Sequence, residues 1–191
     1  FGKSLFLDTL KNIFEGNREY FKGLAIEPKW DWSVKYPVIK ISFGVELRSP
    51  QMVKEALQSC INRNNQHLGV ECQTKDNVSL CFAELIENVY KKHHQKVVVL
   101  IDEYDKAILD NLDQMEVARG AREIIKGFYT VLKEADPYLR FVFLTGVSKF
   151  SKASIFSGLN MLVDISLAPA FGNICGYTQK DIEVDFQEHL Q

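Results

Sequence analysis

The stretch that most constrains the fold is 97–101, an unbroken run of valine, leucine and isoleucine that ends at Asp102 and Glu103. A short, continuous run of this kind predicts a strand that is buried on both faces of a parallel sheet. Ligands of open α/β sheets bind beyond the carboxyl ends of the strands. The two acids are therefore candidate functional residues by their position alone.

Strands and helices alternate along the rest of the chain. Apolar residues recur at helical spacing after Ser4, Ser49-Pro50 is typical of a helix start, and Asp136-Pro137 of a helix end. We expect helices at 4–14, 50–63, 78–94, 113–135 and from 178, with a short helical turn near 155. Strands are expected at 37–43, 96–101, 139–145 and 161–166, and a loop at 64–77. Strands separated by helices imply a parallel sheet with right-handed crossovers.

Composition limits the partners and the cellular location that we expect for the chain. The 191 residues include 23 Lys+Arg and 25 Asp+Glu, so global charge gives no reason to expect nucleic acid or an anionic membrane as a partner. No apolar run is long enough to span a bilayer and no leader pattern precedes the first helix, so we expect a cytoplasmic protein without membrane contact. The cysteines lack C-x-x-C spacing, which favours buried free thiols over a zinc site or a disulfide framework. They are Cys60, Cys72, Cys81 and Cys175.

The first expected helix opens with Gly2-Lys3-Ser4. These residues match the end of the phosphate-binding loop G-x-x-x-x-G-K-[ST], whose first glycine would precede Phe1. At such a helix start the backbone N–H groups face an anion, Lys3 reaches the terminal phosphates and Ser4 binds Mg²⁺. The alternative is that G-K-S is simply a common tripeptide at helix starts.

A second group of candidates lies at the ends of two later strands. Asp102 is placed to hold Mg²⁺, and the adjacent Glu103 to act as general base on an attacking water. Thr145, at the end of the next strand, is placed to contact the γ-phosphate or to orient the water. The alternatives are that the acids cap the following helix and that Thr145 bonds only its own turn.

Several stretches carry a resemblance to a known family: "FGKSLFLDTL", "YPVIKISF", "VVVLIDEYDKAILDN", "LTGVSKFSK" and "ICGYTQKDI". The chain resembles the AAA-ATPase-like domain family, whose members commonly precede a PD-(D/E)XK-type nuclease domain. The resemblance implies ATP and Mg²⁺ as cofactors. It also implies that Gly2, Lys3 and Ser4 belong to the P-loop, that Asp102 and Glu103 form Walker B, and that Thr145 is the sensor residue.

The expected fold is an α/β P-loop NTPase of the AAA-like, additional-strand catalytic-glutamate type. It is a three-layer sandwich with a parallel sheet, in which the Asp102 strand lies between its neighbours and the first strand is missing from this chain. Residues 1–177 form the core and 178–191 begin a helical lid or downstream region. A nuclease domain and a second copy of the chain are possible partners, and nucleic acid is expected only indirectly.

Mg-dependent ATP hydrolysis is the expected function, driving or regulating an attached nuclease or a module directed at nucleic acid. One alternative is a degenerate module that senses a nucleotide with little turnover. Another is a small-molecule kinase, although it would leave the acid pair unexplained.

Overall fold

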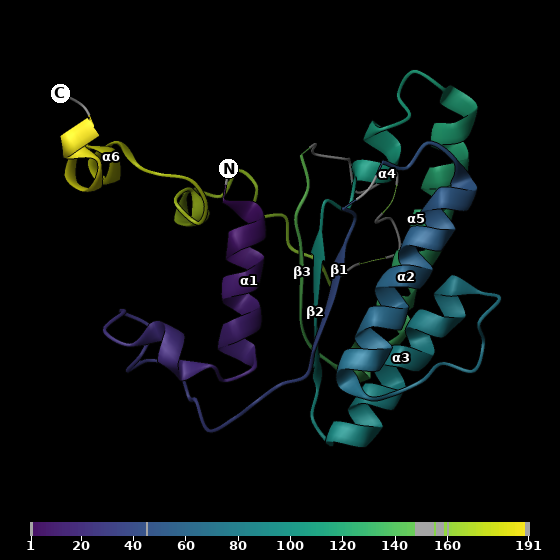
Figure 1. The fold of residues 1–191 in the computed structure, drawn as a ribbon, viewed down its shortest axis with the longest axis horizontal. Coiled ribbons are helices and arrows are strands. Elements are labelled where there is room, and N and C mark those ends of the chain that lie inside the picture. The colour runs from purple at the N-terminus through teal and green to yellow at the C-terminus, as the bar shows by residue number, and fades with distance from the viewer. Residues whose placement is uncertain (1, 45, 148–154, 156–158, 160, 190–191) are drawn as a thin grey trace.

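A parallel sheet with helices on both faces forms the body of the protein (Figure 1). This computed structural model describes residues 2–44, 46–147, 155, 159 and 161–189. Within these ranges the sheet has three strands in the order β1-β2-β3, and both pairs are parallel. The strands are β1 (Val38–Ser42), β2 (Val97–Asp102) and β3 (Leu139–Leu144). The predicted parallel α/β architecture is confirmed, with the Asp102 strand between its neighbours as expected.

The helices form a layer on each side of the sheet (Figure 1). One face is covered by α1 (Lys3–Phe14), and the other by α2 (Pro50–Leu68), α3 (Val78–His93) and α5 (Met115–Glu134). All four helices begin within two residues of their expected starts. The shorter elements are η1 (Arg18–Phe21), α4 (Lys106–Leu109), η2 (Asp136–Tyr138), η3 (Pro169–Phe171), α6 (Gln179–Asp185) and η4 (Gln187–His189).

The central strand β2 is buried along its whole length, as its unbroken apolar run predicts. Successive side chains of a strand point to opposite faces. Val98 and Leu100 accordingly join the smaller core cluster with α1, whereas Val97, Val99 and Ile101 join the larger cluster under α2, α3 and α5. Because β2 is packed on both faces, Asp102 is held at a fixed position at the carboxyl end of the sheet.

Helix starts follow the capping signals in the sequence. The Ser49 side chain accepts a hydrogen bond from the Met52 N–H at 3.1 Å, and Pro50 occupies the first turn. The Asn77 side chain caps α3 by accepting from Ser79 N–H at 3.0 Å. Helix α6 begins with a complete capping box between Thr178 and Asp181, at the expected start of the last helix.

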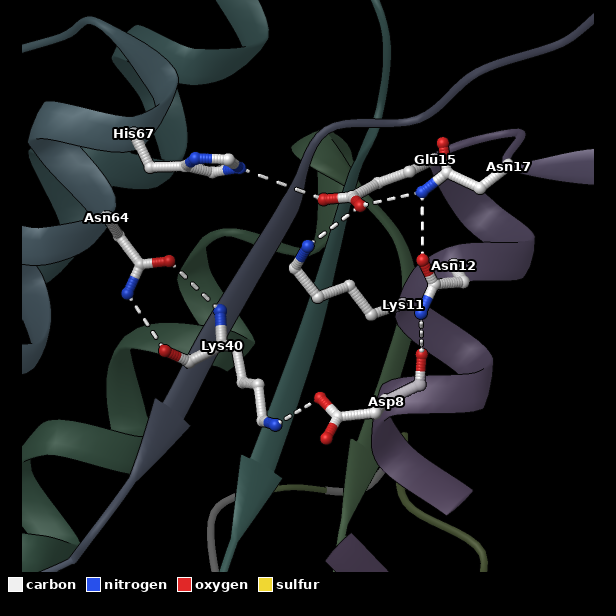
Figure 2. Close-up of polar contacts among 8 residues, drawn as sticks. All are labelled: Asp8, Lys11, Asn12, Glu15, Asn17, Lys40, Asn64 and His67. Atoms are coloured by element: carbon white, nitrogen blue, oxygen red, sulfur yellow. Dashed lines mark hydrogen bonds and ion pairs between the residues drawn. The ribbon is translucent and has the colours of Figure 1, made fainter. Parts of the chain in front are cut away.

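Helix α2 runs five residues beyond Arg63, where we expected it to end, and the loop is correspondingly shorter. The reason is a tertiary contact between α2 and β1. The buried Asn64 side chain accepts from the backbone N–H of Lys40 at 3.0 Å and donates to the Lys40 carbonyl at 2.8 Å (Figure 2). Lys40 lies on the outer edge strand β1, so these two bonds occupy backbone groups that the sheet leaves unpaired. They hold α2 against β1 past the predicted end.

Two further expectations concern the segment after β3. Residues 161–166 form turns and irregular chain, so the strand expected there is wrong. The segment instead contributes Leu162 and Ile165 to the wall of a groove beside β3, without ladder hydrogen bonds among the described residues. The helical turn expected near Ile155 lies largely outside the described residues.

The prediction of free thiols is wrong for one pair of cysteines. Cys72 and Cys81 form a disulfide, whereas Cys60 is a buried free thiol and Cys175 is free and half-buried. The chain after α2 folds back over α3, where Glu84 accepts from the Gln73 N–H at 2.5 Å. This return brings Cys72 beside the first turn of α3, a contact that cysteine spacing alone does not reveal.

Candidate functional site

Two hydroxyl groups from distant elements meet the carboxyl of Asp102 at the end of β2. The Ser4 hydroxyl, in the first turn of α1, donates to Asp102 Oδ2 at 2.6 Å. The Thr145 hydroxyl, just after β3, donates to Asp102 Oδ1 at 2.8 Å. Asp102 itself is only 3% exposed. Each oxygen of one buried carboxyl therefore holds a hydroxyl, and three of the candidate residues converge.

Gly2 sets the start of α1. Its φ of 82° lies in the left-handed region, which glycine adopts without strain. A Cβ on Gly2 would also lie 3.3 Å from the backbone nitrogen of Gly176, so the two chain segments pack closely. The structure thus places the segment around Cys175-Gly176 beside Gly2, a neighbour that sequence reasoning did not identify. The quoted stretch "ICGYTQKDI" was the available signal.

Lys3 is the first residue of α1 and is half-buried. Its side chain makes no hydrogen bond or ion pair with any residue that the structure describes. The helix behind it has 12 residues, and its first N–H groups carry the positive end of the helix dipole. Lysine and helix start together form a positive end on α1, next to the Asp102 carboxyl.

Thr145 is fixed by its backbone as well as by its side chain. Its N–H donates to the Ile101 carbonyl at 2.9 Å, and its carbonyl accepts from the Tyr104 N–H at 3.0 Å. The residue is 8% exposed. Its hydroxyl reaches across to Asp102 and not into its own turn, which was the alternative interpretation of this threonine.

Glu103 leaves the strand in an unusual backbone conformation. Its φ is 55°, in the left-handed region that residues with a Cβ rarely occupy. Such conformations cost about 1–3 kcal/mol and cluster at functional sites. The side chain is half-buried and makes no hydrogen bond or ion pair with the described residues. The N-cap residue of helix α4 is Asp105, and no described side chain makes a capping bond there, so neither Asp102 nor Glu103 caps that helix.

A further acid of the same segment, Asp105, was not singled out from the sequence. It is fully buried, and its Oδ2 accepts from the Val147 N–H at 2.9 Å. A Cβ on Gly146 would lie 2.6 Å from Tyr104 Cε1 and 2.7 Å from Asp105 Oδ1, so only glycine fits there. The signal in the sequence is the second aspartate of "DEYD", which sequence reasoning alone does not distinguish from the two site acids.

A groove with a cavity volume of about 560 Å³ runs along the edge of β3 that faces away from β2. Its walls are mainly apolar and include Phe6 and Leu10 of α1, Phe141 and Phe143 of β3, and Leu162 and Ile165. Within the described part of the chain no other strand pairs with this edge. The groove begins beside the start of α1, close to the candidate site.

Known sequences identify the family. The family model described as "Predicted AAA-ATPase" matches residues 1–156, most of the chain. The chain belongs to the predicted AAA-ATPase family. The "Uncharacterized protein in vnfD 5'region" of Azotobacter chroococcum mcd 1 is 46% identical over 191 residues. That match covers all of this chain and 37% of the relative, so the chain spans about a third of that protein's length. No solved structure matches the chain.

Membership of the predicted AAA-ATPase family suggests a nucleotide-binding ATPase domain. The three-stranded parallel sheet of the described residues is consistent with a P-loop-like domain. Those residues contain no cluster of three or more His, Cys, Asp or Glu side chains suited to a metal ion. None of their helices is both long and apolar enough to cross a membrane.

Proposed function

We propose that this domain binds ATP with Mg²⁺ at the carboxyl end of β2 and hydrolyses the nucleotide. The observation that carries the proposal is the Asp102 carboxyl, which receives hydroxyls from Ser4 at 2.6 Å and Thr145 at 2.8 Å. This position, at the carboxyl edge of a parallel sheet, is where such folds bind ligands. Family membership supports nucleotide binding independently of the geometry.

The phosphate end of the nucleotide is proposed to lie at the start of α1. Helix N-termini offer unpaired backbone N–H groups and a positive dipole end to anions. Gly2 allows the left-handed turn into the helix, and Lys3 supplies a cation that is not paired with any described residue. In this proposal Gly2 and Lys3 contact the terminal phosphates.

Ser4 and Asp102 are the residues proposed to hold Mg²⁺. A hydroxyl and a carboxyl oxygen 2.6 Å apart are both hard oxygen donors, the kind that Mg²⁺ prefers. The ion commonly keeps several waters and takes only one or two carboxylates, together with phosphate oxygens of the substrate. Bound Mg²⁺ would neutralise charge on the phosphate oxygens.

Glu103 is proposed as the general base of hydrolysis. The oxygen of a water attacks the γ-phosphorus, the bond from that phosphorus to the β–γ bridging oxygen breaks, and the proton of the water passes to the Glu103 carboxylate. ADP and inorganic phosphate are the products. The left-handed backbone at Glu103 turns it out of the strand line, and the side chain has no partner among the described residues. Thr145, fixed on Asp102, is proposed to orient the water or contact the γ-phosphate.

We also propose the finer fold assignment, an additional-strand, catalytic-glutamate sandwich of the AAA-like type. In this proposal the strand that leads into Gly2 occupies the apolar groove along β3. The groove volume of about 560 Å³ and the open edge of β3 support it. Residues 1–177 would then form the ATPase core, and the capped helix α6 would begin a lid or downstream region.

The work driven by ATP is proposed from family resemblance alone. We propose a cytoplasmic protein in which the domain drives or regulates an attached nuclease or nucleic-acid module. DNA cleavage by the full-length protein, measured with and without ATP, tests this coupling. A second copy of the chain is a further proposed partner, which mass measurement with and without Mg·ATP would test. Cleavage that is indifferent to ATP would contradict the proposed coupling.

The proposed activity is tested by phosphate release from ATP, measured for the full-length protein with Mg²⁺ and with EDTA. We expect turnover that requires Mg²⁺. Tight Mg·ATP binding without turnover would instead support a nucleotide-sensing module. ADP release that requires a small-molecule acceptor would support a kinase, and the absence of both binding and turnover would contradict the nucleotide site.

A further inference from the structure

The side chain of Asp105 packs against the chain that follows β3. It is fully buried, and Oδ2 accepts from the Val147 N–H at 2.9 Å. A Cβ on Gly146 would lie 2.7 Å from Asp105 Oδ1, so the backbone there rests against this carboxyl. One buried acid therefore fixes the two residues that come immediately after Thr145.

The backbone of Thr145 is already tied to the loop that carries Asp105. Thr145 receives the Tyr104 N–H at 3.0 Å, and its own N–H donates to the Ile101 carbonyl. These bonds fix the end of β3, but they do not hold the chain beyond it. The Asp105–Val147 bond provides a second anchor, two residues after Thr145.

The surroundings of Asp105 form a rigid support. Tyr129 of α5 is completely buried; burial raises its pKa well above the usual value, and the nearby Asp105 carboxyl raises it further. Tyr129 therefore keeps its hydroxyl proton, which it donates to the Tyr104 carbonyl at 3.4 Å. The turn that holds Asp105 is thus attached to α5 as well as to β3.

We propose that Asp105 is a positioning residue for hydrolysis, acting through Thr145. By holding the Val147 N–H, Asp105 keeps the Thr145 hydroxyl directed at Asp102, and with it the orientation of the attacking water. Asp105 itself is fully buried, and the proposal assigns it no contact with the nucleotide. This inference rests on the proposed ATPase function and adds to it a residue that positions the Thr145 hydroxyl.

Asp110 provides a matched control in the same segment. Its Oδ2 accepts from the Leu47 N–H at 3.0 Å, so it also anchors the loop of a neighbouring strand by a carboxyl to backbone bond. That loop follows β1 and contains none of the candidate site residues. Replacing either aspartate by alanine removes the same kind of bond, and Asp110→Ala also removes an ion pair with Lys106 at 3.3 Å. Only Asp105, however, contacts the chain that follows Thr145.

The first measurement is turnover of the full-length protein. Asp105→Ala should lower kcat by about tenfold or more, the loss expected for a buried bond to a carboxyl, with Mg·ATP affinity unchanged within about twofold. Asp110→Ala should keep kcat within about twofold. In a Thr145→Val background, Asp105→Ala should have little further effect, because coupled residues are not additive. Equal losses for the two alanine variants, or additive losses with Thr145→Val, would overturn the proposal.

The second measurement does not depend on activity. Amide hydrogen exchange at Val147 should accelerate by about tenfold or more in Asp105→Ala and stay unchanged in Asp110→Ala. Unchanged exchange at Val147 would overturn the role of Asp105, whereas a parent without turnover would overturn the proposed function instead. If the alanine variant does not fold, Asp105→Asn retains one acceptor oxygen, and the same comparison should show a smaller change in the same direction.

Discussion

The hydroxyl of Ser4 donates to the carboxyl of Asp102 over 2.6 Å, although 98 positions separate the two residues in the chain. The contact joins the first turn of α1 to the end of the central strand. It places the candidate phosphate-binding residues and the candidate metal-binding acid at one point. The account of this domain as an ATPase depends on that junction.

Thr145→Val should impair both stability and turnover. Valine keeps the branched shape but removes the hydroxyl that donates to Asp102 at 2.8 Å, leaving a buried carboxyl oxygen with one partner fewer. We expect a loss of roughly 1–3 kcal/mol in the free energy of unfolding and a lower kcat. Chemical denaturation and phosphate release measure the two effects. Thr130→Val is the control, since its hydroxyl bonds only the Lys126 carbonyl on the exposed face of α5; a similar loss in both variants would contradict a special role for Thr145.

Glu103→Gln should separate binding from chemistry. Glutamine keeps the size of the side chain but cannot accept the proton of the attacking water. We expect Mg·ATP affinity to be retained and hydrolysis to fall by roughly 10²–10⁴-fold, the usual contribution of a positioned general base. Affinity is measured by calorimetric titration and hydrolysis under saturating ATP. Hydrolysis at the parental rate would remove Glu103 from the mechanism.

Gly146→Ala should destabilise the loop after β3. The added Cβ would lie 2.6 Å from Tyr104 Cε1 and 2.7 Å from Asp105 Oδ1, which forces both groups to shift. We expect a loss of about 1–3 kcal/mol in the free energy of unfolding, typical of overpacking. Gly127→Ala is the control: its Cβ would meet Ser79 Oγ at an ordinary 3.8 Å, and alanine within α5 should stabilise by about 0.5–1 kcal/mol. Thermal or urea unfolding that ranks the two variants in the opposite order would refute the described packing.

Asn64→Ala should open the outer edge of the sheet. The change removes both bonds between Asn64 and the Lys40 backbone (Figure 2), leaving groups of an edge strand exposed to other chains. We expect a loss of about 1–3 kcal/mol in the free energy of unfolding and more self-association at high concentration, followed by light scattering. The control Asn62→Ala alters an exposed residue of the same helix, whose side chain accepts from Gln58 at 3.0 Å. Equal behaviour of the two variants would show that Asn64 does not protect this edge.

Local sequence signals were sufficient for the three strands of the sheet and for the starts of the long helices. The unbroken run before Asp102 marked the buried central strand, and Ser49-Pro50 marked the start of α2. The end of α2 was missed because its polar residues read as a loop, whereas Asn64 is buried against the backbone of β1. The Cys72–Cys81 pair was missed for the same kind of reason, since it depends on how the chain returns over α3.

The candidate site shows the same division between local and tertiary information. The convergence of Ser4, Asp102 and Thr145 could be expected from the sequence, because each lies at a helix start or strand end and such ends meet at one edge of a parallel sheet. The sequence does not single out Asp105 from the neighbouring acids. Its proposed role depends on the bond that it accepts from the Val147 N–H, more than forty positions away. The strand expected at 161–166 is wrong, because these residues pack as turns and irregular chain in the wall of the groove beside β3, which β-forming residue types alone do not reveal.

The most direct test of the central claim is a titration of ATP into the full-length parent and into Asp102→Asn, each with Mg²⁺ and with EDTA. Asparagine keeps the size of the side chain and removes the charge that is proposed to organise the metal. The parent should bind ATP at least about tenfold more tightly with Mg²⁺ than with EDTA, and Asp102→Asn should lose most of that difference. If Asp102→Asn keeps both the parental affinity and its dependence on Mg²⁺, the nucleotide site is not at the end of β2.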